Sequence, residues 1–385
     1  MRTIKDIHYL VYPEEEKSNT IVDRFLSSAI DNRIAYHNEE ELNSIINELQ
    51  INTIDSKDVI ILKPFLGRFY QVCPGSPYMI CCRYRVINTC FNCLYNCSYC
   101  YMHVYLNNYG IVQFTNTERL FAELHDFIKN CLQSMVYRIG TGEFTDSLMF
   151  DEITGIGSEL IQFFSKYNNI FFELKTKSAN IDHLLDIPSK GNAVIAWSLN
   201  TPHNIAYYEH DTARLDERIH AAVKAIDAGY YVAFHFDPII LYHGWENDYY
   251  NVIKLLQEKI DPEKVVWISM GGFRYHLHFR EILRDKFPEE MMTVYEMFPG
   301  IDGKYRYFKP LRIQIYNFMY QQLHEIFKKA YIYLCMEADY MWQEITGKGF
   351  HSSEELEQDI SNHLRSLSTK KYHFLLTMRY NTYLL

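Results

Sequence analysis

The chain has 385 residues, of which 48% are apolar and 22% charged, and its formal net charge is −10. These fractions are ordinary for globular proteins, so they exclude a disordered or fibrous chain, and the length allows one large α/β domain with appendages or two ordinary domains. The acidic balance argues against a broad surface that grips nucleic acid, so any such contact must be local.

The first twenty residues, MRTIKDIHYLVYPEEEKSNT, lack the apolar run of a secretory signal and turn acidic at Glu14. No later stretch approaches about 18 uncharged apolar residues, so no membrane contact is predicted and the expected compartment is the cytoplasm. In a reducing compartment, nine cysteines indicate metal ligands, reactive thiols or buried small side chains rather than disulfides.

The first predicted elements lie in residues 1–77. An acidic stretch of helical period, EEELNSIINELQ, begins at Glu39, and a short apolar run, VIILKPF, begins at Val59. This mixture predicts a small N-terminal cap ahead of the main domain.

From residue 78 onward, short β-branched and aromatic runs alternate with longer segments of helical period. This alternation is typical of β-α units around a parallel sheet. The predicted strands are 78–87, 136–142, 170–176, 193–200, 230–239 and 265–272.

Six such units predict an α/β fold, a partial (β/α)6 barrel similar to an incomplete TIM barrel, over residues 78–288. In barrels of this kind the chemistry lies at the carboxyl ends of the strands. The alternation is lost from about Glu289, so residues 289–385 are predicted to form a mostly helical C-terminal extension.

Four cysteines follow the first predicted strand within eleven residues: Cys90, Cys93, Cys97 and Cys100. A zinc-bound interaction module would use all four thiolates, but three residues between the two pairs leave little chain to wrap the metal. Four inert, buried cysteines would be an unusual density in so short a segment. Alternatively, Cys93, Cys97 and Cys100 form a Cys-x3-Cys-x2-Cys set, which can hold a four-iron cluster while leaving one iron without a protein ligand.

The remaining cysteines are assigned to packing, since thiols in a reducing compartment behave as small apolar groups. They are Cys73, Cys81, Cys82, Cys90 and Cys131.

The spacing of the three cysteines, with Tyr99 just before the last of them, resembles the radical SAM superfamily. In that superfamily S-adenosylmethionine (SAM) chelates the free iron through its amino and carboxylate groups. The second predicted strand ends in RIGTGEFTDS, where Gly140 and Gly142 permit close backbone approach and Glu143 can accept hydrogen bonds from an ammonium group. This element resembles the Gly-Gly-Glu motif that binds the SAM amino group.

Other strand ends carry further candidates for SAM binding. Lys177 follows the third strand and could pair with the SAM carboxylate, or it could be a solvated loop lysine. Ser198 and Asn200 alternate toward one face of the fourth strand and could bind a ribose hydroxyl or a carboxylate. His235 lies on the fifth strand, where a histidine is more often a hydrogen-bonded core residue.

A closer resemblance rests on several motifs in a matching order. These are CSYCY at 97–101, KTKSANIDHLLD at 175–186, WSLNT at 197–201, AAVKAIDAGYYVAFHFDPII at 221–240 and HGWE at 243–246. Together they resemble the spore photoproduct lyase family, often labelled DNA repair photolyases, over roughly residues 78–259.

The resemblance implies a [4Fe–4S] cluster on Cys93, Cys97 and Cys100 that cleaves SAM to methionine and a 5′-deoxyadenosyl radical. The radical then abstracts hydrogen from a methylene-bridged thymine dimer, so the implied activity is that of a DNA repair lyase. It further implies SAM contacts at Lys177, Ser198 and Asn200, radical handling by Tyr99 and Tyr101, and an electron donor such as flavodoxin or ferredoxin.

One feature departs from the family pattern. Lyases of the family carry a cysteine just beyond the second strand that returns a hydrogen atom to the product radical, but the corresponding region reads GEFTDS here. Cys335 could replace that cysteine from the C-terminal extension, or it could be buried in the apolar run YLCME. The departure leaves two hypotheses: repair of a pyrimidine dimer in DNA, and radical modification of a non-DNA substrate.

Contact with damaged DNA is predicted in GKYRYFKPLR, residues 303–312. The stretch interleaves aromatic residues with Lys304, Arg306, Lys309 and Arg312, a composition suited to phosphate contact and base stacking. It could equally be a solvated amphipathic edge. A lesion would have to leave the duplex to reach the barrel mouth.

Overall fold

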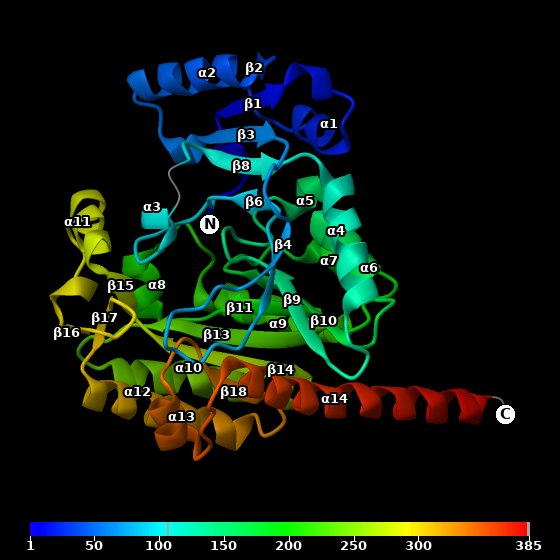
Figure 1. The fold of residues 1–385 in the computed structure, drawn as a ribbon, viewed down its shortest axis with the longest axis vertical. Helices are drawn as coiled ribbons and strands as arrows, with labels where there is room; N and C mark the ends of the chain where they lie inside the picture. Colours follow the sequence, from blue (N-terminus) through cyan, green and yellow to red (C-terminus); the bar gives the residue numbers. More distant parts are fainter. Residues whose placement is uncertain (106–107, 383–385) are drawn as a thin grey trace.

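The computed structural model describes residues 1–105 and 108–382, and most of its strands belong to two large sheets. The smaller of these sheets lies at the top of Figure 1 and the larger one in its lower half. Two short antiparallel sheets complete the set. Among the described residues, no helix has the length and apolar character needed to cross a bilayer.

The N-terminal sheet has the strand order β2-β1-β3-β8-β6. Its members are β1 (Tyr9–Pro13), β2 (Asn32–Tyr36), β3 (Val59–Lys63), β6 (Cys90–Phe91) and β8 (Ile111–Phe114). Helices α1 (Thr20–Leu26) and α2 (Glu39–Ile51) begin after Asn19 and Asn38, whose side-chain oxygens accept hydrogen bonds from the first free backbone N–H groups. The region predicted as a cap therefore belongs to a small α/β sheet, two strands of which come from beyond residue 77.

The larger sheet curls into a partial barrel with the order β18-β14-β13-β11-β10-β9-β5-β4. Neighbouring strands are parallel, except that β4 is antiparallel to β5. Its members are β4 (Tyr70–Val72), β5 (Arg85–Ile87), β9 (Tyr137–Thr141), β10 (Ile170–Thr176), β11 (Ala193–Ser198), β13 (Tyr231–Ile239), β14 (Val265–Gly272) and β18 (Tyr331–Leu334). The predicted partial barrel is confirmed, and all but the first predicted strand lie within two residues of their predicted bounds.

Two parts of the barrel differ from the sequence-based prediction. The strand predicted at 78–87 is confined to Arg85–Ile87 because Tyr78 and Arg83 have φ of 63° and 51°, a left-handed conformation that a strand cannot contain. Strand β18 was not predicted, since a run of four apolar residues, YIYL, carries too little periodicity to identify. The predicted domain boundaries at residues 77 and 288 stay predictions.

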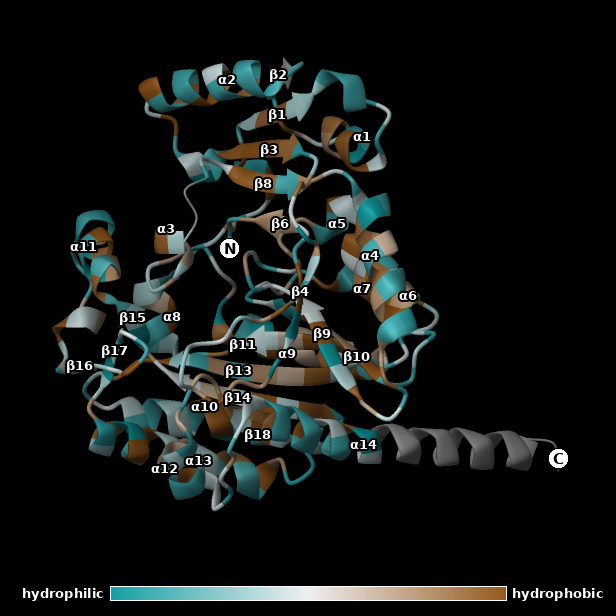
Figure 2. Ribbon diagram, viewed as in Figure 1, coloured by the Kyte–Doolittle hydropathy of each residue, from teal (hydrophilic) through white to brown (hydrophobic). Residues whose placement is uncertain are grey.

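Helices between the barrel strands confirm the predicted β-α units. The longer ones are α4 (Thr117–Asn130), α6 (Ile156–Phe164), α9 (Leu215–Asp227) and α10 (Trp245–Lys259). The shorter ones are α3 (Met102–Tyr105), α5 (Asp151–Thr154), α7 (Asp182–Leu185) and α8 (Pro202–Tyr208). Figure 2 shows hydrophobic residues concentrated in the strands and interspersed with hydrophilic ones on the helices, as expected for amphipathic helices that cover a sheet.

The C-terminal part is mostly helical, as predicted. Its helices are α11 (Leu277–Lys286), α12 (Lys309–Ile326), α13 (Asp339–Thr346) and α14 (Ser353–Thr382). A small sheet is formed by β15 (Arg274–His276), β16 (Met297–Pro299) and β17 (Lys304–Tyr307). The other small ladder joins β7 (Asn96–Cys97) to β12 (Glu209–His210).

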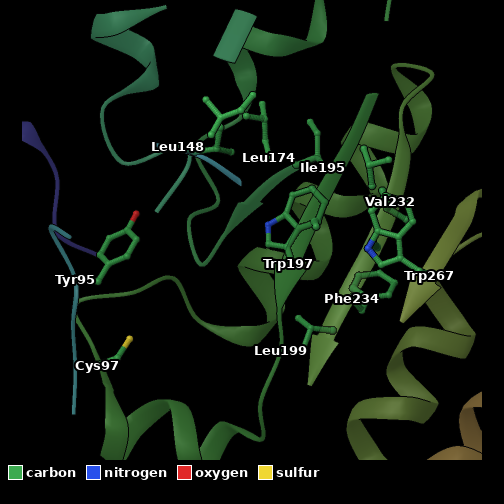
Figure 3. Packing of buried hydrophobic residues seen from close by; sticks show 14 of the residues in the cluster. Tyr95, Cys97, Leu148, Leu174, Ile195, Trp197, Leu199, Val232, Phe234 and Trp267 are labelled. Atoms are coloured by element: carbon green, nitrogen blue, oxygen red, sulfur yellow. The ribbon is translucent and has the colours of Figure 1, made fainter. Parts of the chain in front are cut away.

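Alternating side chains on each barrel strand face the covering helices and the barrel interior. On β10, Phe172 stacks on Phe164 of α6, whereas the neighbouring Glu173 points inward. The Glu173 carboxylate accepts a hydrogen bond from the Tyr84 hydroxyl at 2.5 Å and from the Trp267 indole at 2.9 Å, and it lies 2.8 Å from Nε2 of His235. The interior is therefore a hydrogen-bonded polar network beneath an apolar shell, part of which is shown in Figure 3.

Candidate active site

The three-cysteine loop follows the carboxyl end of β5, the first of the parallel barrel strands in the chain. Cys97 is 8% exposed and lies in β7, which pairs with β12, while Cys93 and Cys100 are half-buried. Figure 3 shows Tyr95 and Cys97 on a segment separate from the barrel strands that carry Trp197 and Phe234. Pairing of β7 with β12 and the burial of Cys97 hold this part of the loop within the protein.

Burial disfavours ionisation of the thiols in this loop, so the thiolates need a bound cation nearby. Burial raises the pKa of Cys93 to about 12 and raises that of Cys97 further above its ordinary value. The charge of an ionised Cys100 thiol also raises the pKa of Cys93 and Cys97. A cationic cluster would reverse this effect, because metal binding stabilises thiolates.

Three thiols in this loop could each bind a different iron. Among the described residues, no three His, Cys, Asp or Glu side chains are gathered around one point. A four-iron cluster takes each thiolate on a different iron, so three thiolates would leave one iron without a protein ligand.

Lys57, in the short 3-10 helix Ser56–Asp58 that precedes β3, anchors the cysteine loop. Its ammonium group donates to the backbone oxygens of Cys93 at 2.6 Å and Tyr95 at 3.2 Å, and to the Asn92 side-chain oxygen at 3.0 Å. Asn92 itself has φ of 70° and donates to the Gly110 carbonyl at 2.9 Å. Sequence reasoning missed Lys57, since it lies 36 residues before Cys93 and no local pattern marks it.

The structure brings Tyr99 of the cysteine loop close to Lys177, which directly follows β10. Both residues were predicted to lie at the carboxyl ends of the barrel strands. The Lys177 ammonium lies 5.6 Å from the centre of the Tyr99 ring. The Tyr99 hydroxyl donates to Glu209 at 2.5 Å, and Glu209 forms a buried ion pair with Arg218 at 2.6 Å. Burial raises the pKa of Tyr99 and the Glu209 charge raises it further, so the phenol keeps its proton.

Tyr101 and Glu143 form a second contact across the rim of the barrel, the edge formed by the carboxyl ends of its strands. The Tyr101 hydroxyl donates to the Glu143 backbone oxygen at 2.5 Å, and the Glu143 carboxylate pairs with Lys175 at 2.7 Å. A Cβ on Gly140 would lie 2.0 Å from the Tyr84 hydroxyl, and one on Gly142, whose φ is 92°, would lie 2.8 Å from the Lys175 carbonyl. Both glycines thus permit close approach of β10 and Tyr84 to β9.

Three predicted SAM contacts lie deeper in the barrel. Ser198 is 7% exposed and its carbonyl accepts a hydrogen bond from Arg218. Asn200 is 1% exposed, and its side-chain oxygen accepts from the Tyr249 hydroxyl at 2.7 Å. His235 lies 2.7 Å from the Ser269 hydroxyl as well as close to Glu173. Binding of SAM by the Asn200 and His235 side chains would require them to exchange hydrogen bonds that they make within the protein.

Cys335 lies directly after β18, where the last barrel strand meets the rim. It is half-buried, and its backbone N–H donates to the Met270 carbonyl on β14. Arg274 donates to its sulfur at 3.5 Å and pairs with Asp237 at 3.1 Å. Burial raises the pKa of Cys335 and the Asp237 charge raises it further, so this thiol keeps its proton at neutral pH.

The predicted DNA-contacting residues do not form one open basic patch. Arg306 and Arg312 are 4% and 9% exposed, and each forms an ion pair, with Asp302 and Glu337 respectively. Lys304 is half-buried and donates to Ser76, whereas Lys309 is exposed beside the Tyr340 ring. Two of the four positive charges are therefore neutralised within the protein.

A partial parallel barrel whose first strand leads into a Cys-x3-Cys-x2-Cys loop defines the class of radical SAM enzymes. The chain belongs to the spore photoproduct lyase family, since the family model described as spore photoproduct lyase matches residues 68–339. Enzymes of this family use a [4Fe–4S] cluster and SAM.

Curated relatives agree with this assignment. The spore photoproduct lyase of Clostridium acetobutylicum is 24% identical over 247 residues, which cover 62% of this chain and 73% of the relative. That of Bacillus subtilis is 26% identical over 236 residues, which cover 60% and 67% of the two chains.

Solved structures of spore photoproduct lyase share the fold. One is complexed with dinucleoside spore photoproduct and has a TM-score of 0.71 at 20% identity, covering 85% of this chain and 98% of that one. A variant with bound AdoMet and dinucleoside spore photoproduct has a TM-score of 0.69 at 21% identity, with the same coverage. The predicted fold class is confirmed by these matches.

Replacing Lys57 with methionine is expected to weaken retention of the cluster. The change keeps most of the side-chain volume but removes the ammonium group that donates to the Cys93 and Tyr95 carbonyls. Loss of such an outer contact lowers metal affinity by about 10- to 100-fold. The measurement is iron released to a chelator after anaerobic reconstitution, followed by visible absorbance.

The matched control is Lys63→Met, which removes a lysine of the neighbouring strand β3 that pairs with Glu39. It should retain iron as the unchanged protein does. Equal iron release from the Lys57 variant and this control would show that Lys57 does not position the loop.

Proposed function

We propose that this protein repairs spore photoproduct in DNA by radical SAM chemistry. The observation that carries the proposal is the family match over residues 68–339, which includes the three-cysteine loop and the barrel strands. The substrate class comes from relatives whose structures contain dinucleoside spore photoproduct. The relatives do not favour the alternative of a non-DNA substrate, which rests on the absence of the family's donor cysteine from the GEFTDS segment.

In this proposal Cys93, Cys97 and Cys100 hold the cluster, and Lys57 positions their loop. When bound, the cluster and SAM supply a 5′-deoxyadenosyl radical, while the protein orients the reactants and excludes water. Tyr99 and Tyr101 flank Cys100 in the chain, and both hydroxyls are fixed by hydrogen bonds. They are proposed to take part in hydrogen-atom transfer near the cluster.

The rim also offers charges that suit the amino acid part of SAM. Lys177 is proposed to pair with its carboxylate and Glu143 with its ammonium group. Glu143 already accepts a cation, the Lys175 ammonium at 2.7 Å, so its carboxylate is placed for such a contact. Gly140 and Gly142 fix the strand end that carries Glu143.

Ser198, Asn200 and His235 are proposed to complete SAM binding on the interior side of the rim. Asn200 lies in the segment that follows β11, and its amide donates to Glu209 at 3.4 Å. Glu209 also holds the Tyr99 hydroxyl. This chain of hydrogen bonds couples the fourth strand end to the cysteine loop.

Cys335 is proposed as the donor that returns a hydrogen atom to the product radical. Donation of a hydrogen atom requires an S–H bond, and burial beside Asp237 keeps this thiol protonated by raising its pKa. Cys335 lies directly after β18 and beside β14, at the rim where a lesion would bind, which supports this role. It would take the place of the donor cysteine of the family, which the GEFTDS segment lacks.

DNA contact is proposed through Lys304 and Lys309, with Arg306 and Arg312 holding the shape of the segment through their ion pairs. Phosphate contacts by so few lysines predict weak, salt-sensitive affinity for undamaged DNA. The electron for SAM cleavage is proposed to come from a flavodoxin- or ferredoxin-like protein.

The test uses the full chain, reconstituted anaerobically, reduced and supplied with SAM and dinucleoside spore photoproduct. The expected result is conversion of the lesion to the undamaged dinucleotide, measured by chromatography, with formation of 5′-deoxyadenosine in the same reaction. Cys335→Ala should still cleave SAM but should yield less repaired product and more trapped side products.

Undamaged thymine dinucleotide serves as the substrate control and should give no conversion. The proposed substrate would be contradicted by two results together. SAM would be cleaved at the same rate with the lesion, with the undamaged dinucleotide and with neither, and no repaired product would form.

A further inference from the structure

Three neighbouring barrel strands bring a carboxylate, a guanidinium and a thiol to one part of the rim. Strands β13, β14 and β18 are adjacent and parallel, so their carboxyl ends lie at the same edge of the sheet (Figure 1). Asp237 lies near the end of β13, Arg274 lies two residues after the end of β14, and Cys335 directly follows β18. The order of the strands therefore gathers three groups that are far apart in the chain.

The Arg274 guanidinium connects the other two groups. Its Nη1 donates to Asp237 Oδ1 at 3.1 Å and to the Gly272 carbonyl at 3.1 Å. Its Nη2 donates to Asp237 Oδ2 at 3.2 Å and to the Cys335 sulfur at 3.5 Å. Each terminal nitrogen carries two N–H groups, so these contacts use all of them. The two-point pair with Asp237 fixes the plane of the guanidinium and hence the direction of the N–H that meets the sulfur.

The backbone of β14 leaves room for this ion pair at Gly271. A Cβ at that position would lie 2.6 Å from Asp237 Oδ1 and 2.8 Å from Arg274 Nη1. Any other residue would therefore displace one of the two charged groups. The side chains of Arg274 and Asp237 are only 14% and 24% exposed, so the pair is largely shielded from solvent.

The backbone on both sides of the Cys335 thiol is also held. The Cys335 N–H donates to the Met270 carbonyl at 2.8 Å, which continues the β14–β18 ladder by one residue. The next residue, Met336, has φ of 54°, a left-handed conformation that residues other than glycine seldom adopt. The Glu337 carbonyl then accepts from the Ile80 N–H at 2.9 Å. Strained conformations of this kind cluster at functional sites, and here one directly follows the thiol.

We propose that Arg274 is a positioning residue that holds the Cys335 thiol at the rim, which rests on the proposed role of Cys335 as the hydrogen-atom donor. The sulfur accepts the hydrogen bond from Arg274, so this contact does not use the S–H bond. In the transfer the S–H bond breaks, a C–H bond forms on the product radical, and the unpaired electron moves to the sulfur. Asp237 acts one step further away, by orienting Arg274.

A lysine at position 274 would keep the positive charge but not this geometry. Its ammonium group has no plane and cannot hold both Asp237 oxygens and the sulfur in one fixed arrangement. With SAM and dinucleoside spore photoproduct, the Arg274→Lys enzyme should still form 5′-deoxyadenosine. The ratio of repaired dinucleotide to trapped side products should fall by about 10- to 100-fold, the effect that a misplacement of about 1 Å produces.

The experiment compares this ratio among anaerobically reconstituted full chains, measured by chromatography. Arg274→Lys in the Cys335→Ala background should lower the ratio no further than Cys335→Ala alone, because the contact has lost its thiol. A merely structural role for Arg274 would lower it again. The matched control is Arg284→Lys, a change of an exposed arginine on α11, which should give the ratio of the unsubstituted chain.

An unchanged ratio in Arg274→Lys, where Cys335→Ala lowers it, would overturn this inference and leave the proposed donor intact. An unchanged ratio in Cys335→Ala would remove the donor and the inference with it. Where Arg274→Lys fails to fold, Asp237→Asn provides the same test, since it keeps the side-chain shape and weakens the pair with Arg274. It should lower the ratio in the same direction, and an unchanged ratio would overturn the positioning role.

Discussion

Replacing Cys97 with alanine is expected to abolish cluster binding and the release of 5′-deoxyadenosine. Cys97 is the most buried of the three predicted ligands, and its strand β7 pairs with β12, which fixes its backbone in the loop. Loss of one ligand leaves two thiolates for four irons. We expect visible absorbance and bound iron to fall to background and nucleoside release to fall by at least about 1,000-fold, a loss of roughly 4 kcal/mol in transition-state stabilisation.

Cys93→Ala and Cys100→Ala should behave in the same way, while Cys131→Ala serves as the matched control. Cys131 is half-buried and donates to the Ile128 carbonyl at the end of α4. Retention of iron and of nucleoside release by any of the three ligand variants would refute the assignment of the cluster. Loss of both from the control variant would indicate general instability.

Replacing Glu173 with alanine is expected to lower the free energy of unfolding by about 3–5 kcal/mol. The change leaves the Tyr84 hydroxyl and the Trp267 indole as unpaired donors and His235 without its carboxylate. Breaking a buried pair by removing one partner has effects of this size. The measurement is urea unfolding at pH 7, and Glu118→Ala, an exposed position on α4, should change the free energy by less than about 0.5 kcal/mol.

The same carboxylate predicts how stability depends on pH. Burial acts to raise the pKa of Glu173, but His235, Lys175 and Tyr84 outweigh it and hold the pKa at about 2. A carboxyl group whose pKa is lowered by folding stabilises the folded state fully at pH values above its ordinary pKa, which is near 4.5 for Glu173. This stabilisation is lost as the pH falls toward 2. The unsubstituted chain should lose up to about 3 kcal/mol over that interval through this group.

The Glu173→Ala variant should lack that part of the acid dependence. Comparison of its unfolding curves with those of the unsubstituted chain at pH 4.5 and below isolates the contribution. Parallel losses of stability in both proteins would show that Glu173 is not ionised in the folded state.

The barrel strands that the sequence predicts well are those with long apolar runs. Residues 170–176 and 265–272 have the predicted bounds because each run is flanked by helical periodicity and a loop. The first predicted strand is too long because backbone conformations at Tyr78 and Arg83 depend on the loop that closes the barrel. The N-terminal sheet and β18 were missed because their short strands are stabilised by pairing with segments distant in the chain.

The candidate site likewise contains some features that the sequence predicts and others that depend on tertiary packing. The cysteine spacing, Tyr99 and the strand-end positions of Lys177 and Glu143 can be read locally, because ligand spacing and strand periodicity are local properties. The carboxylate that holds Tyr99, the lysine that anchors the cysteine loop and the ion pairs of Arg306 and Arg312 cannot, because each involves residues whose contact depends on packing.

The sequence by itself determined the three-thiol spacing, the order of the β-α units and the family, since each depends on which residues follow one another in the chain. Only the tertiary structure shows which distant segments meet at the edge of the barrel. The loop between β4 and β5 contacts Glu337 and Ser353, which follow β18, through the backbone N–H groups of Ile80 and Cys81. Contact between such groups depends on the free energy of packing the whole barrel, which no local pattern records.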